Sequence, residues 1–288
     1  SNSGVATFSG LGITGSPGSY TITYSSGLLT SASQAITVVR GDQSALSVSS
    51  TSGTYGAALT LTTSGGSGTG AVTYVVVDGT ATGCAESGGL LTVTAAGTCT
   101  VTATKALDTN YNAVSSSATT VTFAKASQAS LTLTSTTGTY GATITLSFSG
   151  GTGTGSVSYS VTGTGCSISS GLLSKTAAGD CSVTVTKAID TNYEAASSSA
   201  TTVTFAQASN TVTFASLADR LWSASTFTVS PTATSGDTPT VASTTTNVCT
   251  VSSLTVTMVS SGTCSLTASE DGNGNYLAAT NVVRTFEI

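Results

Sequence analysis

The stretch AGTCTVTATKALDTNY (Ala96–Tyr111) decides the fold, because the chain repeats it twice. It returns as AGDCSVTVTKAIDTNY (Ala178–Tyr193) and, more loosely, as SGTCSLTASEDGNGNY (Ser261–Tyr276). Every copy contains a cysteine, an alternating segment, an Asp- or Asn-rich turn and a tyrosine at the same spacing. The 288-residue chain is therefore built from a repeated unit.

The cysteines set the boundaries of the repeats. They fall in three pairs with one common separation: Cys84 and Cys99, Cys166 and Cys181, and Cys249 and Cys264. The motif GTYG precedes the first and second pairs, at Gly53 and Gly138, and SSSATTVTFA follows them, at Ser115 and Ser197. Aligned on these markers, the sequence predicts an incomplete module followed by three repeats: residues 1–39, 40–124, 125–206 and 207–288.

The side chains that follow the second cysteine of each pair alternate between apolar and polar, as in a β-strand. After Cys99, the apolar residues Val101 and Ala103 alternate with Thr100 and Thr102, so one face is buried and the other carries hydroxyls. Gly- and Ser-rich turns interrupt these runs, and no segment has the apolar stripe of an amphipathic helix. We predict an all-β chain of tandem antiparallel β-sandwiches that form an elongated rod.

The composition excludes several classes of function. Charged residues make up only 7% of the chain, and the net charge is −5 with no basic cluster, so no nucleic-acid partner is expected. No run of apolar residues is long enough to span a bilayer, so no membrane insertion is expected. The chain has no histidine, which excludes Ser-His and Cys-His catalysis. We predict a protein that is not an enzyme, with no catalytic residue and no cofactor.

The cysteine pairs are predicted to form three disulfides, because the chain has no histidine and no CxxC pair that would favour a metal site. Between Cys166 and Cys181 a strand turns at Ser170 and Gly171 and returns, which brings both cysteines to the same end. In a flat meander these strands would be about 9.6 Å apart, whereas a disulfide joins Cα atoms about 4.4–6.8 Å apart. Either the hairpin swings out or the two strands face each other across the sandwich. Disulfides are typical of secreted and cell-surface proteins.

The third repeat resembles the Ig-like repeats of large bacterial surface and secreted proteins. The matching segments are VCTVS, SGTCSLTAS, GNGNY and the closing VVRTF. The first two repeats are similar to related repeats of such proteins, and residues Gly4–Val38 resemble the later half of another module of this kind. The resemblance implies Ig-like β-sandwiches with one cysteine pair each, acting as spacers, adhesive arms or fibre and coat components. It implies no catalytic residues.

The turns that follow the cysteine strands hold the main candidate site residues: Asp108, Tyr111, Asp190, Tyr193, Asn275 and Tyr276. We expect Asx-turns in which each tyrosine packs back on its own sandwich. Carboxylate and amide oxygens also bind Ca²⁺, and Glu270 and Asp271 make the third turn the best metal candidate. The first two turns offer only one carboxylate each, so we predict structural turns without a metal.

Three further motifs favour a structural explanation over a functional one. Lys105 and Lys187 precede the turns, but the third repeat has Ser269 in that place, which argues against isopeptide bonds. We expect these lysines to be exposed, near the turn carboxylates or at a strand edge. Arg40–Asp42 spell an integrin-binding tripeptide, which we attribute to chance. Trp222 and the singly spread Phe and Tyr rings are expected to serve core packing and turn anchoring, since a sugar-binding face would cluster such rings.

Residues 1–39 are too short to close a sandwich. Three strands are expected there, near Ala6–Phe8, Tyr20–Tyr24 and Ala35–Val39, and their unpaired edges invite another strand. Two explanations stay open. The missing half precedes this segment in a longer chain, or strands from a neighbouring subunit complete it head to tail.

Together these features predict an extracellular structural protein of a bacterium, secreted or at the cell surface. We expect it to build a stalk, filament or surface layer through self-association or as part of a longer chain. The alternative is an adhesin or carbohydrate-binding module, with a glycan or host-surface ligand.

Overall fold

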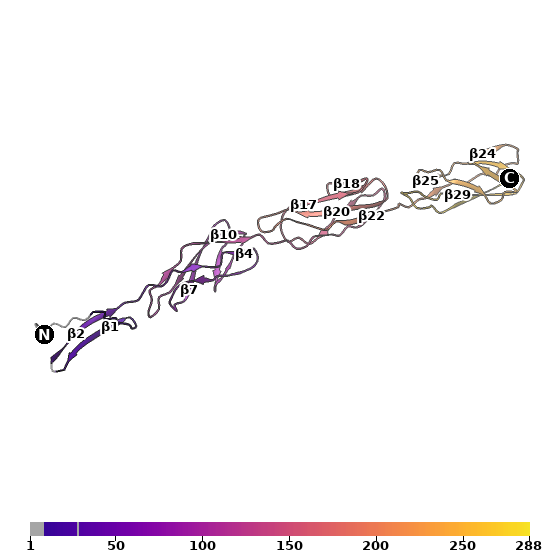
Figure 1. Cartoon of the computed structure of the whole chain (residues 1–288). Helices are drawn as coiled ribbons and strands as arrows, with labels where there is room; N and C mark the ends of the chain where they lie inside the picture. The colour runs from indigo at the N-terminus through magenta and orange to yellow at the C-terminus, as the bar shows by residue number, and fades with distance from the viewer. Residues whose placement is uncertain (1–8, 28) are drawn as a thin grey trace. The chain divides into compact units, whose positions relative to one another are not determined.

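The computed structural model describes residues 9–27 and 29–288, which form 30 β-strands and no helix (Figure 1). The expected all-β fold is confirmed. Contacts divide the chain into two compact units. One unit runs up to Ser127 and includes Ile189–Glu194, and the other comprises Gln128–Ala188 and Ala195–Ile288. The described part of the chain has no helix able to span a membrane. The strand expected at Ala6–Phe8 lies outside the described residues.

A two-stranded hairpin precedes the first repeat. β1 (Gly18–Ser26) and β2 (Leu29–Val38) pair antiparallel, starting with Gly18 opposite Val38. One face of the hairpin carries mainly hydroxyls, and the other carries the larger apolar side chains. This apolar face consists of Tyr20, Ile22, Tyr24, Ala32, Ile36 and Val38. No residue in either strand is buried, so the hairpin has no core of its own.

The first repeat is organised around one long strand. β10 (Gly97–Lys105) pairs antiparallel with β7 (Val72–Asp78) on one side and with β12 (Thr119–Ala124) on the other. β12 also pairs in parallel with β4 (Ser52–Thr54), a strand from the start of the repeat. The remaining strands are β3 (Ser47–Val48), β5 (Leu59–Thr60), β6 (Thr63–Ser64), β8 (Ala85–Ser87), β9 (Leu90–Thr92) and β11 (Val114–Ser115).

The second repeat follows the same pattern. β20 (Gly179–Lys187) pairs antiparallel with β17 (Val157–Thr162) and with β22 (Thr201–Ala206). β22 pairs in parallel with β14 (Thr137–Thr139). The remaining strands are β13 (Thr132–Leu133), β15 (Ile144–Thr145), β16 (Phe148–Ser149), β18 (Cys166–Ser169), β19 (Leu172–Lys175) and β21 (Ala196–Ser197).

The third repeat keeps the central strand but has a shorter list of partners. β29 (Thr263–Ser269) lies between β26 (Thr240–Ser243) and β30 (Val282–Glu287), both antiparallel to it. The remaining strands are β23 (Val212–Thr213), β24 (Thr226–Thr228), β25 (Thr232–Ala233), β27 (Cys249–Ser252) and β28 (Thr255–Met258).

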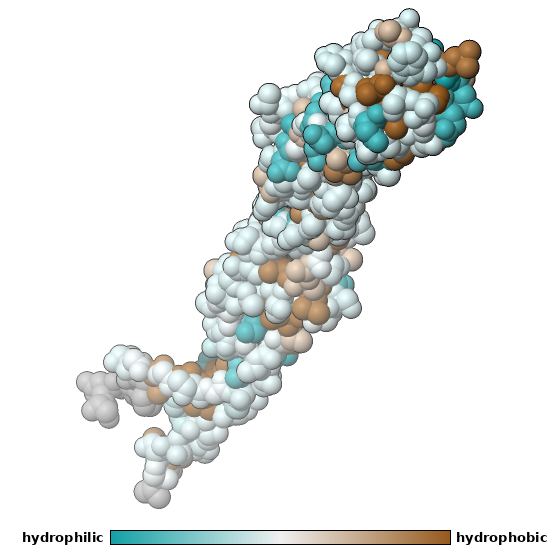
Figure 2. Space-filling model, turned by 90° about the vertical axis from the view of Figure 1, so that its right-hand side faces the viewer, coloured by the Kyte–Doolittle hydropathy of each residue, from teal (hydrophilic) through white to brown (hydrophobic). Residues whose placement is uncertain are grey.

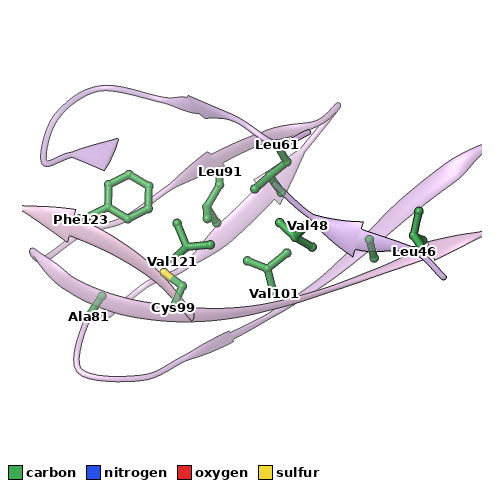
Figure 3. Close-up of a cluster of buried hydrophobic side chains, with 10 residues drawn as sticks. Leu46, Val48, Leu61, Ala81, Leu91, Cys99, Val101, Val121 and Phe123 are labelled. Atoms are coloured by element: carbon green, nitrogen blue, oxygen red, sulfur yellow. The ribbon is translucent and has the colours of Figure 1, made fainter. Parts of the chain in front are cut away.

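Each repeat has its own hydrophobic core. The three clusters of buried side chains lie within residues 46–123, 133–205 and 212–286. In the first cluster, Val101 and Val121 point toward Leu91 between the strands, and Phe123 closes one end (Figure 3). Along β10, buried residues alternate with half-buried threonines, as the sequence pattern predicts.

The surface has little contrast between hydrophilic and hydrophobic regions. The face seen in Figure 2 is mostly pale, with small groups of teal and brown residues. This follows from the composition, since only 7% of residues are charged and Ser, Thr, Gly and Ala dominate.

Candidate interaction sites

The turn at the end of β10 is held by one carboxylate. Asp108 Oδ1 accepts hydrogen bonds from the N–H groups of Asn110 (2.8 Å) and Tyr111 (2.9 Å). Its Oδ2 accepts one from the N–H of Thr69 (2.5 Å). These bonds, that of Thr69 above all, favour the charged form and lower the pKa of Asp108 from 3.8 to about 2. The turn is an Asx-turn fixed by an ionised side chain at neutral pH.

The other two repeats build the same turn. Asp190 Oδ1 accepts hydrogen bonds from the N–H groups of Asn192 and Tyr193, both at 2.8 Å. In the third repeat Asn273 replaces the aspartate, and its Oδ1 accepts from the N–H of Asn275 at 2.8 Å. An amide oxygen offers the same acceptor as a carboxylate oxygen, which explains why both residue types serve in this position.

Two of the turn tyrosines contact a ring of the preceding repeat. The ring of Tyr193 lies edge-on to Tyr55, with centroids 5.6 Å apart and planes at 81°. Tyr276 and Tyr140 form the same arrangement at 5.5 Å and 80°. These T-shaped contacts join neighbouring repeats, which the sequence prediction of a tyrosine packing back on the sandwich did not include.

A hydrogen bond accompanies each ring pair. The N–H of Ala96 donates to Asn192 Oδ1, and the N–H of Ala178 donates to Asn275 Oδ1, both at 2.9 Å. We call this combination, a T-shaped ring pair plus an alanine N–H bound to an asparagine Oδ1, the junction contact. The sequence signal for the junction contact was the recurrence of GTYG, which contains Tyr55 and Tyr140, at a fixed distance from the turns. This spacing does not show which rings contact each other.

In the second and third repeats the disulfide joins two different sheets, whereas Cys84 of the first repeat lies just before β8, outside any strand. In the second repeat Cys166 begins β18 and Cys181 lies on β20, and these strands belong to separate sheets. Their Cα atoms are 6.0 Å apart, and those of the other two pairs are 6.1 and 5.6 Å apart. Of the two arrangements that the spacing left open, the second repeat has the strands facing each other across the sandwich. Ser170 and Gly171, with φ of 50° and 78°, turn the hairpin between them.

The two carboxylates proposed as weak metal candidates, Glu270 and Asp271, differ in burial. Glu270 is only 9% exposed, and its Oε2 accepts a hydrogen bond from the amide of Asn210. Asp271 is exposed. Within residues 9–27 and 29–288, no group of three or more His, Cys, Asp or Glu side chains is placed to hold a metal ion.

The lysines before the turns bind glycine loops. Lys105 Nζ donates to the carbonyl of Gly66, and Lys187 Nζ to that of Gly151, both at 3.2 Å. Both lysines are half-buried, so the expectation of exposed side chains is wrong. Glycine permits this close approach, because a Cβ on Gly66 would lie 2.8 Å from Lys105 Cδ and one on Gly151 would lie 2.9 Å from Lys187 Cδ.

The Arg-Gly-Asp tripeptide is occupied by contacts with the first turn. Arg40 Nε donates to the carbonyl of Asp108 (2.8 Å), and Asp42 accepts from the side-chain amide of Asn112 (3.0 Å). The N–H of Gly41 donates to the carbonyl of Asn110 (2.9 Å). These three residues therefore fix the start of the first repeat to its own turn.

Trp222 is 58% exposed, so the expectation that it packs in the core is wrong. The core is filled instead by Phe227 and Phe286, whose rings lie edge-on with centroids 5.6 Å apart. The guanidinium of Arg220 lies 3.8 Å from the centre of the Phe227 ring. This contact anchors the segment that carries Trp222 while leaving the indole outside.

A pocket of about 440 Å³ lies in the third repeat. It is lined by Thr238, Pro239, Thr240, Val241, Ser253 and Leu254. These residues provide hydroxyls and aliphatic groups and include neither an aromatic ring nor a charge, the groups that usually fix a ligand's orientation.

Comparison with known proteins gives structural likenesses only. No protein-family profile matches the chain, and no curated protein sequence matches it. Domains 1–6 of the surface layer protein SbsC are similar over 94% of this chain, with 14% identity and a TM-score of 0.29. The similarity to Drosophila N-cadherin EC1-4 covers 93% of this chain and 82% of that chain, with 11% identity and a TM-score of 0.28. The similarity to the Escherichia coli adhesin FdeC covers 86% of this chain and 99% of that chain, with 16% identity and a TM-score of 0.26. The chain spans 44% of the SbsC structure.

Proposed function

We propose that the chain is an extracellular structural protein of a bacterial surface, and that strands from another chain complete its N-terminal hairpin. Chains joined in this way would form a stalk, filament or surface layer. Three disulfides support the extracellular location, because such bonds persist in oxidising surroundings. We assign the chain a structural role, in which each sandwich acts as a folded module with its own core.

The register of the hairpin carries the proposal. In β1 and β2, Gly18 lies opposite Val38 and Tyr20 opposite Ile36. In the first repeat, Gly97 lies opposite Phe123 and Cys99 opposite Val121, and the second repeat has the same register. The hairpin therefore reproduces the pair of strands at the end of a complete repeat. The residues of its apolar face occupy positions that correspond, in this register, to the fully buried positions of β10 and β12.

The complete repeats indicate which strands the hairpin lacks. In the first repeat β10 pairs with β7 on its other side, antiparallel, and β12 pairs with β4 on its other side, in parallel. By the same topology, the free edge of β1 takes an antiparallel strand and the free edge of β2 takes a parallel one. Backbone hydrogen bonds would provide affinity, and the apolar face of the hairpin would set the register.

The test is assembly of the full chain, measured by light scattering and negative-stain microscopy. We expect filaments or oligomers whose formation is reduced when Ile22 is replaced by lysine, because the charge lies on the apolar face. Thr21→Lys places the same charge on the hydroxyl face and serves as the matched control. Hydrogen exchange should show slow amides in β1 and β2 only in the assembled state.

Monomers of the intact chain at all concentrations, with fast exchange in β1 and β2, would contradict completion by another chain. So would equal assembly by the Ile22→Lys and intact chains.

A further inference from the structure

The junction contact occurs twice inside the chain, and the third repeat presents one half of it without a partner. In the first repeat the ring partner is Tyr55, whose N–H donates to the carbonyl of Ala124 at 2.8 Å. Tyr140 has the same bond, to Ala206, in the second repeat. These bonds continue the parallel pairing with the last strand of each repeat. The ring partner is thus fixed by register.

The same register places Trp222 at this position in the third repeat. Thr263 lies opposite Glu287, as Thr98 lies opposite Thr122, so Glu287 has the place of Thr122. The N–H of Arg220 donates to the Glu287 carbonyl at 2.9 Å. In parallel strands, a step of two residues along one strand corresponds to a step of two residues along its partner. Ala124, whose carbonyl accepts from the N–H of Tyr55, lies two residues beyond Thr122. Two residues beyond Arg220 is Trp222, which therefore takes the place of Tyr55.

The second half of the contact is also present. Ser261 precedes Gly262, as Ala96 precedes Gly97, so its N–H has the place of the alanine donor. Among the described residues nothing accepts a hydrogen bond from this N–H. Tyr55 and Tyr140 are half-buried by their tyrosine partners, whereas Trp222 is 58% exposed. We call the end of the third repeat defined by Trp222 and Ser261 the free pole, because no turn within residues 9–27 and 29–288 makes the junction contact with it.

The first repeat presents the complementary half. Its turn has the same hydrogen bonds as the other two, but Asn110 is exposed, whereas Asn192 and Asn275 are half-buried. By register, the residue of the hairpin that corresponds to Ala96 is Pro17, just before Gly18. Proline has no N–H, so the hairpin cannot supply the donor for Asn110.

We propose that the free pole of one chain docks the Asn110–Tyr111 turn of a second copy of this chain. Trp222 would meet Tyr111 edge-on, and the Ser261 N–H would donate to Asn110 Oδ1, as at the internal junctions. The interface is heterologous, because the two copies contribute different surfaces, so it adds chains head to tail. It stands apart from the hairpin completion proposed above, since neither β1 nor β2 takes part.

The chain contains one tryptophan, which gives a direct signal. We expect the emission of Trp222 to shift to the blue as the concentration of the full chain rises, in step with the mass from analytical ultracentrifugation. In the Ile22→Lys background, which removes completion of the hairpin by another chain, Trp222→Ser and Asn110→Ala should each weaken association about tenfold or more. A mixture of the two variants retains one intact interface per pair, so it should form dimers that do not grow further.

Matched controls are Thr109→Ala, an exposed change in the same turn, and Val283→Thr, which removes an exposed apolar side chain on β30; both should associate like the intact chain. Ile22→Lys, which tests the hairpin, should leave the tryptophan shift in place. No blue shift and no increase in mass up to about 1 mM would overturn the proposal. Association of the Ile22→Lys chain that survives the further change Trp222→Ser, or a mixture of variants that stays monomeric, would overturn it as well.

Discussion

One asparagine in each turn shows how a neighbour changes the use of a fixed local structure. Asn110, Asn192 and Asn275 have the same place in their turns, and the N–H of each is bound by the side chain two residues earlier. Asn192 and Asn275 each accept a hydrogen bond from the preceding repeat, whereas Asn110 accepts none from the described residues before it. The local sequence therefore determines the turn, and the preceding module determines whether its amide is occupied.

The pKa of Asp108 can be tested directly. Because the pKa is lowered to about 2 in the folded chain, the carboxylate contributes stability above about pH 4, and this contribution is lost as the pH falls toward 2. An NMR titration of the Thr69 and Tyr111 amides should show a midpoint near 2. Asp108→Asn should remove the transition and lower stability at pH 7, since the amide cannot accept from Thr69 in place of Oδ2. A midpoint near 4 would contradict the hydrogen bonds.

At the level of strands, the sequence predicts what depends on neighbours along the chain. Alternation predicted the buried face of β10, and Ser170 with Gly171 predicted the turn between β18 and β19. The ring partners and the place of Trp222 were not predictable in this way. They depend on residues far apart in sequence, such as Tyr55 and Tyr193, and alternation shows that a side chain faces inward without showing what it meets.

The disulfide between β18 and β20 should account for a large part of the stability of the second repeat. It closes a loop with a sequence separation of 15 residues, which corresponds to about 3 kcal/mol in the chain-entropy estimate. Replacing Cys166 and Cys181 together by alanine should lower the free energy of unfolding of this repeat by about that amount in urea titrations. The other two repeats are internal controls, because their cores are separate, and an equal loss in all three would contradict this view.

For the molecule as a whole, three separate cores mean that each repeat folds on its own set of buried side chains. The junction contacts add a nearest-neighbour term, as in other repeat proteins. Stability is thus approximately a sum over repeats and junctions. A chain of this kind can lengthen by whole repeats, because each added repeat brings its own core.

The parallel pairing of β4 with β12, and of β14 with β22, determines how a repeat responds to a pulling force. In each pair a strand near the start of the repeat lies beside the strand at its end and runs in the same direction. Tension on the chain then slides the two strands past each other. All their hydrogen bonds are loaded in shear at once, instead of being opened one by one as in a zipper.

Single-molecule stretching should therefore show each repeat yielding in one abrupt step. Reduction of the disulfides should lengthen each step, because the segment between the paired cysteines, a sequence separation of 15, becomes extensible. The added length is roughly 50 Å per repeat at about 3.4 Å per residue. Smooth extension without steps would contradict the shear geometry. Each disulfide thus limits how far an unfolding repeat can lengthen. A chain under tension can therefore absorb energy as its repeats unfold, while the disulfides restrict the increase in its total length.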